Sequence, residues 1–409
     1  MTIITLLNDG FVKYQNWRIK MKILLTTDTY FPMTNGVVVS TDNLYMQLKN
    51  LGHEVKILTL SSDGKEHILG DVLYFSSYHI NIYPDARIIR PMRNRIISEV
   101  IKWRPDIIHS QSEFSTMIVA KYIKRKLNIP QVHTYHTLYE DYLHYFLGGK
   151  IIRKSTLSKL TGFLLNTFDT VIAPTEKVKE KLESYNVAAN IEIIPTGINL
   201  KKFQQEISVD ERNKLLKRYG FSGEDKILVY VGRVAEEKNI EEVISFYNKA
   251  LEYIGNTKLL IVGGGPCLSK LKTMVMQYKL ESNVKFTDMI TSDEINKYYK
   301  LGDYFVTAST SETQGITYIE ALASGLPVIC KWDRCIDNLI IDGVTGFTYK
   351  DEKEFVNILI NITSNKELEK NMKVDIKNIV NEYSIENFGQ RVFNIYNNVL
   401  IDNKVHYSA

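Results

Sequence analysis

The sequence predicts an α/β protein made of two doubly wound domains, each with a parallel β-sheet covered by helices. Three observations predict this fold class. Short apolar runs alternate with longer segments of helical periodicity, and almost continuously apolar runs are typical of parallel strands buried on both faces. The alternation occurs twice, on either side of a polar stretch at residues 197–225. At 409 residues the chain is also too long for one ordinary hydrophobic core.

Each half supplies its own series of strands. In the first half we expect strands at Lys22–Thr26, Glu54–Leu58, Ile107–His109, Gln131–Thr134, Thr170–Ala173 and Ile191–Pro195. In the second half we expect them at Lys226–Gly232, Lys258–Gly263, Asn283–Phe286, Tyr304–Ala308 and Pro327–Cys330. Helical periodicity is clear between them, in Thr41–Leu51, Ser115–Leu127, Ile240–Ile254 and Pro266–Lys279. Strands that are joined by helices form a parallel sheet.

We place the domain boundary near residue 200. The first domain then covers residues 21–200, the second covers residues 201–384, and residues 1–20 form an N-terminal extension. The last segment, residues 385–409, has aromatic residues on its apolar face, and we expect it to pack back on the first domain. Two doubly wound sheets that face each other place the carboxyl ends of their strands around one cleft, where ligands bind in such folds.

The composition excludes several classes of protein. Hydrophobic content of 44% and charged content of 24% are typical of a soluble globular chain. No apolar run approaches the roughly 18–20 residues that a membrane span needs, and the first residues do not form a secretory signal. Three cysteines argue against a disulfide scaffold, and Cys330 and Cys335 lack the further ligands of a zinc site. We expect these thiols to be structural bystanders in a reducing cytoplasm.

Positive charge is concentrated in one window. Residues 87–159 hold 14 Lys and Arg against 5 Asp and Glu, although the whole chain carries a net charge of only +4. Such a region indicates an anionic partner, which can be a membrane surface, a nucleic acid or a phosphorylated substrate. The window has no base-stacking aromatic pattern and no recognised nucleic-acid module, so we do not expect nucleic acid.

The strongest local signal is the segment 307–327, in which a strand, a small polar loop and a helix follow one another. The helix begins near Gly315 and Ile316, where unpaired N–H groups attract an anion, and glycine lets the anion approach closely. Glu312 precedes the helix and can face a sugar. Glu320 lies inside the helix and can reach a pair of vicinal hydroxyls. The alternative is that Glu312 is only a helix-entry acid favoured by the helix dipole and that Glu320 is a solvated helix position.

A second strand end carries two cations. Gly232 permits a tight turn, after which Arg233 and Lys238 lie before the next helix. Cations near a helix N-terminus are unfavourable unless an anion is nearby. An arginine and a lysine together neutralise a departing diphosphate. The chain contains no Asp-x-Asp motif, so a metal-held diphosphate is not expected and the two cations become more necessary.

Further candidates lie at other strand ends. Gly36 stands near the first helix of the first domain, in a loop that lacks the three glycines of a dinucleotide fingerprint. The turn at residues 263–266, which includes Gly264, joins a strand to a helix. His133 and His136 lie at the end of another strand. A single substrate-positioning histidine is a better interpretation of this pair than a zinc site.

In order and spacing, these motifs resemble the retaining glycosyltransferases of the GT-B fold, whose hallmark is Glu-x7-Glu, here Glu312 and Glu320. The resemblance covers about residues 21–400. It implies that Arg233 and Lys238 bind the donor diphosphate, that Glu320 binds the ribose and that Glu312 lies near the transferred sugar. It implies further substrate contacts at Gly36, Gly232, Gly264, Asp288, Met289, Ile290, Gln314, Gly315 and Ile316, with residues 288–290 on the base, and it makes His136 a cleft histidine near the reacting sugar.

Within that family, segments 133–142 and 311–315 are similar to those of diacylglycerol α-glucosyltransferases. This implies a UDP-glucose donor, a 1,2-diacylglycerol acceptor, no cofactor or metal, and a peripheral position on the cytoplasmic face of the cell membrane. Three positions depart from common family residues: Asn35 stands for a glycine, Asn239 for a glycine and Gln314 for a phenylalanine. A soluble or cell-surface glycan acceptor and a non-catalytic sugar-nucleotide-binding protein are the alternatives.

A lipid acceptor also fits the basic window. Residues 93–102 predict a helix in which Ile96, Ile97, Val100 and Ile101 form one apolar stripe beside basic residues. Such a helix can lie in the headgroup region of an anionic membrane. The alternative is a helix that packs its apolar stripe against its own domain.

Overall fold

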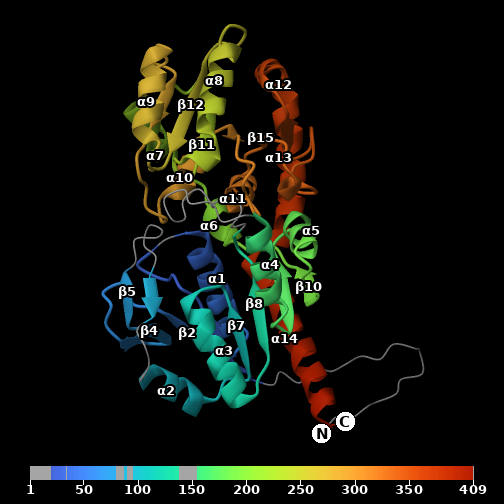
Figure 1. Ribbon diagram of the computed structural model, residues 1–409. Helices are drawn as coiled ribbons and strands as arrows, with labels where there is room; N and C mark the ends of the chain where they lie inside the picture. The colour runs from blue at the N-terminus through green and yellow to red at the C-terminus, as the bar shows by residue number, and fades with distance from the viewer. Residues whose placement is uncertain (1–19, 34, 80–86, 90–94, 138–153, 409) are drawn as a thin grey trace, which may run out of the picture.

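The computed structural model describes residues 20–33, 35–79, 87–89, 95–137 and 154–408. The chain forms two α/β halves stacked along one axis, with the N-terminal half below and the C-terminal half above in Figure 1. Each half has its own parallel sheet with helices on its faces. The predicted class, two Rossmann-like doubly wound domains, is confirmed.

The N-terminal sheet has eight strands in the order β10-β9-β8-β7-β1-β2-β4-β3. All neighbouring pairs are parallel except β3 with β4. A separate antiparallel pair joins β5 and β6. The bounds are β1 Lys22–Thr26, β2 Glu54–Leu60, β3 His67–Leu69, β4 Val72–Phe75, β5 Ser77–His79, β6 Arg87–Ile89, β7 Ile107–Ser110, β8 Gln131–Thr134, β9 Thr170–Ala173 and β10 Asn190–Ile193.

The C-terminal sheet has six parallel strands in the order β13-β12-β11-β14-β15-β16. Its bounds are β11 Lys226–Val231, β12 Thr257–Val262, β13 Val284–Phe286, β14 Tyr304–Thr307, β15 Val328–Lys331 and β16 Gly346–Tyr349. The predicted strands are present in both sheets. The strands β3 to β6 and β16 were not predicted, because they are short and most of them are not continuously apolar.

Helices cover both faces of each sheet (Figure 1). In the N-terminal half they are α1 Gly36–Asn50, α2 Arg95–Trp103, α3 Ser115–Leu127, α4 Lys154–Leu165 and α5 Glu176–Ser184. The later part of the chain has further helices, with 3-10 helices labelled η. They are α6 Leu200–Gln204, α7 Val209–Tyr219, η2 Glu236–Lys238, α8 Ile240–Ala250, α9 Leu268–Gln277, α10 Ile295–Tyr299, α11 Ile316–Ala323, η3 Arg334–Ile336, α12 Glu352–Ser364, α13 Lys366–Ile379, η4 Val380–Tyr383 and α14 Ile385–Ser408.

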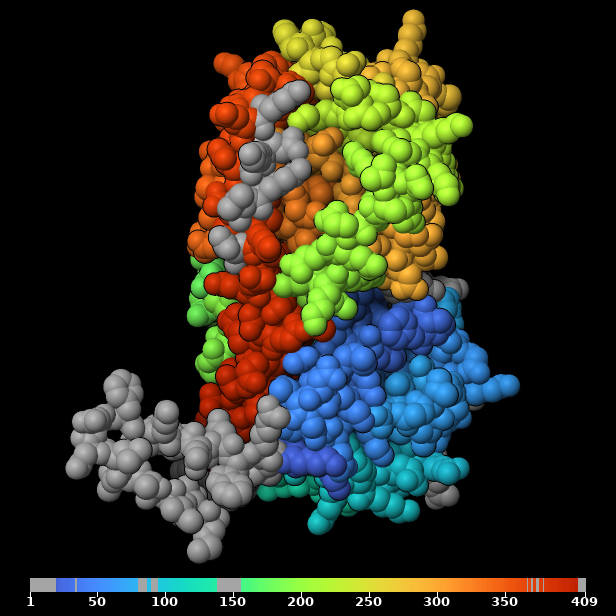
Figure 2. Space-filling view, turned by 180° about the vertical axis from the view of Figure 1, so that it is seen from behind, coloured from blue at the N-terminus to red at the C-terminus, as the bar shows by residue number. Residues whose placement is uncertain are grey.

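The chain passes between the halves at two adjacent places. Ile198 N–H donates to Tyr383 O and Ile385 N–H donates to Ile198 O, at 2.9 and 3.1 Å. Gly197 is required there, because a Cβ would lie 2.6 Å from Phe388 Cβ. Beyond this crossing α14 descends along the N-terminal half, and Figure 2 shows it in red beside the blue segments. Its apolar face completes the N-terminal core through Phe388, Val392, Tyr396 and Val399.

The apolar stripe of α2 is covered by its own domain. Ile96, Ile97 and Val100 are buried in the core between α2, α3 and the sheet, and Ile101 packs against the same cluster. The prediction that this stripe lies in lipid headgroups is therefore wrong, and the alternative of a domain-packing helix is confirmed. Among the residues that the structure describes, no helix has both the length and the apolar character needed to cross a bilayer.

In both sheets the strand order reverses next to the first strand. In the N-terminal half β1 lies between β7 and β2, and in the C-terminal half β11 lies between β14 and β12. Chain connections leave such a point in opposite directions, which opens a crevice outside the carboxyl ends of the strands. The loops after β1, β7, β11 and β14 are therefore where ligands are expected.

Candidate functional site

The N-terminus of α11 is shaped to receive an anion. Gly315 precedes the helix in the left-handed region, with φ at 71°. A Cβ on this residue would lie 2.2 Å from the ring of Tyr318, so glycine is required. No side chain caps the helix, which leaves its first N–H groups available for a negatively charged ligand.

Glu312, in the loop before α11, is paired with Lys238, another of the predicted site residues. Lys238 Nζ lies 2.5 Å from Glu312 Oε1, and the Ser309 hydroxyl donates to the same oxygen at 2.8 Å. Burial alone would raise the pKa of Glu312, but Lys238 and Ser309 lower it below its usual value. Glu312 is therefore a carboxylate, held by the loop after β11 and the loop after β14 together.

Glu320 has a different environment. It lies within α11 and accepts a hydrogen bond from the Tyr299 hydroxyl at 2.8 Å. Burial raises its pKa to about 7, against the lowering effect of the Tyr299 bond and of nearby Lys202. Glu320 is half-buried and bonded to Tyr299, so its surroundings differ from those of a freely solvated helix position.

Arg233 is exposed at the carboxyl end of β11, and its guanidinium has no partner among the described residues. Its backbone is fixed, because the buried Tyr230 hydroxyl donates to Arg233 O at 2.9 Å. Gly232, which precedes it, has a φ of 154°. The loop thus presents an unpaired cation at the end of a strand, where an arginine can bind an anion.

The predicted base-binding residues lie together on the next loop. Gly263 and Asp288 form a β-bridge, and Met289 lies against Gly264. Asp288 has a φ of 59°, its carbonyl accepts from the Thr287 hydroxyl, and its side chain pairs with Lys272 at 2.9 Å. Met289 is 76% exposed, and Ile290 packs on the core. The exposed Met289 side chain thus lies beside Gly264.

Predicted residues from the two halves face each other. A Cβ built on Gly36, at the start of α1, would lie 3.7 Å from Ile316 Cδ1, at the start of α11. Asn35 caps α1 by accepting from Val38 N–H at 3.0 Å. The structure therefore brings the N-termini of α1 and α11 together across the boundary between the halves.

His136 is held in a neutral form. Its Nε2 lies 2.7 Å from Gln111 Oε1. Because that oxygen only accepts, Nε2 carries the proton and Nδ1 is an acceptor. Burial lowers the pKa of His136 to about 4, while Glu113 opposes the shift and His133 adds to it. At neutral pH the imidazole is therefore an uncharged hydrogen-bonding group.

The sequence interpretation missed several members of this cluster. Asp28, after β1, accepts from Thr116 N–H at 2.7 Å, and its other carboxyl oxygen is buried without a partner. Burial raises the pKa of Asp28 to about 6. Glu113 accepts from His133 at 3.1 Å. Asp28 and Glu113 lie after β1 and β7, so their position after apolar strands was the available signal.

Gln314 has a partner outside the donor site. Its Nε2 donates to Thr196 O at 2.9 Å, and its Oε1 accepts from Thr196 N–H at 2.8 Å. Both residues are buried. Its side chain is therefore committed to the N-terminal half, and any contact with a substrate has to come from its backbone.

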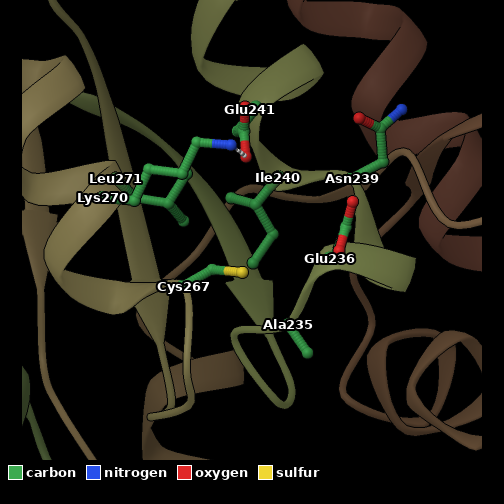
Figure 3. Close-up of a pocket in the computed structure, with 8 residues that line it drawn as sticks. All are labelled: Ala235, Glu236, Asn239, Ile240, Glu241, Cys267, Lys270 and Leu271. Carbon is green, nitrogen blue, oxygen red and sulfur yellow. Dashed lines mark hydrogen bonds and ion pairs between the residues drawn. The ribbon is translucent and has the colours of Figure 1, made fainter. Parts of the chain in front are cut away.

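Other candidate sites carry no ligand chemistry. Within the described ranges, no three His, Cys, Asp or Glu side chains are grouped so that they would hold a metal ion. Cys330 and Cys335 are free and buried. A cavity of 180 Å³ lies beside η2 and the starts of α8 and α9, where Lys270 pairs with Glu241 at 2.6 Å (Figure 3). It includes none of the predicted site residues.

Known proteins match both halves of the chain. Residues 34–202 match the family model described as Glycosyltransferase Family 4, and residues 211–378 match the one described as Glycosyl transferases group 1. The chain is similar to alpha-monoglucosyldiacylglycerol synthase of Streptococcus pneumoniae, with 36% identity over 94% of this chain and 87% of that protein. The enzyme of the same name from Acholeplasma laidlawii is 31% identical over 87% of this chain and 93% of that protein.

The chain belongs to the glycosyltransferase family that these family models and relatives represent. Among solved structures, Anabaena HepE in complex with UDP-glucose has a TM-score of 0.73 at 16% identity, covering 92% of this chain and all 100% of that one. This likeness shows the fold alone, and it is the two-domain GT-B fold predicted from the sequence. The chain is thus a glycosyltransferase with the GT-B fold.

Proposed function

We propose that this glycosyltransferase transfers glucose from UDP-glucose to the 3-hydroxyl of 1,2-diacylglycerol with retention of the α configuration. The observation that carries the proposal is the unpaired guanidinium of Arg233 together with Lys238 and the uncapped N-terminus of α11. These groups converge where the strand order reverses, and they are suited to a diphosphate leaving group without a metal. The two relatives above, named for the same product, support the acceptor.

The donor half has a distinct role for each residue. Arg233, Lys238 and the first N–H groups of α11 stabilise the charge that develops on the departing diphosphate. Glu320 accepts hydrogen bonds from the ribose hydroxyls, and the loop at Asp288–Ile290 binds the base. Glu312 is a carboxylate already paired with Lys238, so it positions sugar hydroxyls and is not a covalent nucleophile.

The acceptor half supplies neutral groups. His136 Nδ1 is an acceptor at neutral pH, so it orients a hydroxyl of the transferred sugar without adding charge. The lipid hydroxyl attacks the anomeric carbon from the face that the diphosphate leaves. The departing phosphate oxygen accepts the hydroxyl proton, and attack on the face that the diphosphate leaves retains the configuration. Bond formation to the lipid oxygen and cleavage of the sugar–phosphate bond are balanced by this proton transfer.

An anionic membrane surface is the proposed location of the acceptor. In place of the buried stripe of α2, exposed apolar side chains lie on two other helices of the N-terminal half. Ile118 and Tyr122 on α3 are 63% and 44% exposed, and Leu160 and Phe163 on α4 are 63% and 75% exposed. The last turn of α3 is basic. Each cation near an anionic leaflet contributes about 1 kcal/mol to the free energy of membrane binding. The apolar side chains contribute further by inserting into the interface.

Product analysis tests the function. The purified chain is incubated with vesicles that contain diacylglycerol and with UDP-glucose, UDP-galactose or UDP-N-acetylglucosamine in turn. The expected result is UDP release that requires diacylglycerol and one glucosylated lipid in the mass spectrum. A product formed only on a glycan acceptor would replace the lipid assignment. UDP binding without turnover on any acceptor would contradict the catalytic proposal.

A further inference from the structure

The loop that carries Glu312 is held by the opposite half of the molecule. Lys177, on α5 of the N-terminal half, donates to Thr310 O at 3.0 Å and to Glu312 O at 3.1 Å. The same Nζ pairs with Asp333, at 2.8 and 2.9 Å from its two carboxyl oxygens. Every acceptor of this ammonium group lies on the C-terminal half, and two of them are backbone carbonyls of the donor loop.

Two neighbouring contacts reach the same loop. The Thr175 hydroxyl donates to Thr313 O at 2.7 Å, and Thr196 exchanges two hydrogen bonds with Gln314. Residues 310, 312, 313 and 314 are thus each bound by the N-terminal half. Lys177 and Asp333 are well shielded, with side-chain exposures of 18% and 11%, and a shielded charge-assisted bond is stronger than an exposed one.

We infer that Lys177 is a positioning residue of the donor site, supplied by the acceptor half. It fixes the backbone at residues 310–312, and this fixes where the Glu312 carboxylate meets Lys238. Donor affinity then depends on a contact between the two halves, although Lys177 touches neither the diphosphate nor the sugar. The inference rests on the proposed function, since it assigns residues 310–315 to the donor.

A nearby ion pair provides a matched control. Arg334, in η3, pairs with Glu180 of α5 at 2.7 Å. It joins the same two elements as Lys177 and Asp333, but it does not contact the donor loop. Its side chains are 48% and 52% exposed, so it contributes little to stability. Loss of the Arg334–Glu180 pair weakens the contact between the two halves but leaves the hydrogen bonds to residues 310–314 in place.

The test measures UDP and UDP-glucose binding by calorimetry, separately from turnover. We expect K177M to weaken UDP-glucose binding about tenfold and to raise the donor KM, with the diacylglycerol KM unchanged. E180A should bind the donor as the wild type does. Because K177M leaves the Asp333 carboxylate unpaired, K177M/D333N is measured beside it. The double variant removes the loop contacts without a stranded charge, and we expect the same weakening.

The outcomes separate the two proposals. If the wild type does not bind UDP, the proposed function itself fails. If the wild type binds UDP and K177M/D333N binds UDP-glucose equally well, Lys177 does not position the loop. Equal losses in E180A and K177M would also overturn the inference, because they would show that adhesion alone matters. Thermal unfolding of each variant, with melting temperatures near the wild type, confirms that binding is measured on folded protein.

Discussion

The two halves share one topology, but they treat polar groups near the cleft in opposite ways. The C-terminal half presents charges: an unpaired Arg233 and the Lys238–Glu312 pair, with Glu312 kept ionised. The N-terminal half presents neutral groups, since burial lowers the pKa of His136 to about 4 and holds the pKa of His109 well below its usual value. One half is suited to an anion, and the other to an uncharged acceptor.

Both arrangements follow from the same strand ends. After β11 the loop exposes Arg233, and after β14 the loop leads into the uncapped N-terminus of α11. After β7 and β8 the side chains are enclosed, in part by α14, whose Tyr396 hydroxyl lies 2.6 Å from His109 Nδ1. The difference shows that chemistry on a doubly wound sheet depends on which partners the loops bring to each side chain. Each prediction below tests one side of this comparison.

The largest effect is expected at the charged half. R233A should lower kcat/KM by about two to three orders of magnitude, because a group that stabilises charge in the transition state is lost. UDP release measured with saturating acceptor checks this. R218A, which removes another exposed arginine of the same half, is the control. Near-normal turnover of R233A would remove Arg233 from the donor site.

At the neutral half, H136F should lower kcat by about tenfold to a hundredfold, which is the scale of one lost hydrogen bond to the reacting sugar. UDP binding should not change, because UDP lacks the sugar that His136 orients. The wild-type rate should also show no ionisation of His136 between pH 6 and 8, since the pKa of His136 is about 4. Weaker UDP binding by H136F would break the division between the halves.

A smaller effect is expected at Glu320, a half-buried carboxyl of the charged half. Its pKa of about 7 lies above the ordinary 4.5, so its contribution to stability is complete below about pH 4.5 and is lost as pH rises through 7. E320Q should remove this loss and should weaken UDP binding about tenfold. Urea unfolding at pH 5 and pH 8 measures the difference. If the free energy of unfolding changed equally between pH 5 and pH 8 in E320Q and in the wild type, the raised pKa of Glu320 would be contradicted.

The smallest effect concerns the outer surface of the neutral half. F163S should reduce binding to anionic vesicles a few-fold, because one large apolar side chain no longer enters the interface. Y253S is the matched control, since Tyr253 is 66% exposed on the C-terminal half. Vesicle flotation at two salt concentrations measures binding. Equal behaviour of F163S and Y253S would place the membrane contact elsewhere on the molecule.

The sequence alone identified the strands that carry the site. The runs before Thr27, Gly232 and Ser309 are apolar because both faces of each sheet are covered, and this makes strand ends recognisable without a structure. Glycine at position 315 and the pair Glu312 and Glu320 followed from local spacing. The strands β3, β5 and β6 were not identified because they are short and are not continuously apolar.

Only the tertiary structure decided the partners of these residues. Tyr299 on Glu320, Gln111 on His136, and Lys177 on the donor loop are contacts between distant segments, and no local pattern specifies them. The apolar stripe of α2 shows this most clearly, because the same helical periodicity is compatible with insertion into a membrane and with packing in a core. The sequence determined which side chains are available at each strand end. Packing decided which partners they meet and how far they are shielded from water, and hence which are charged.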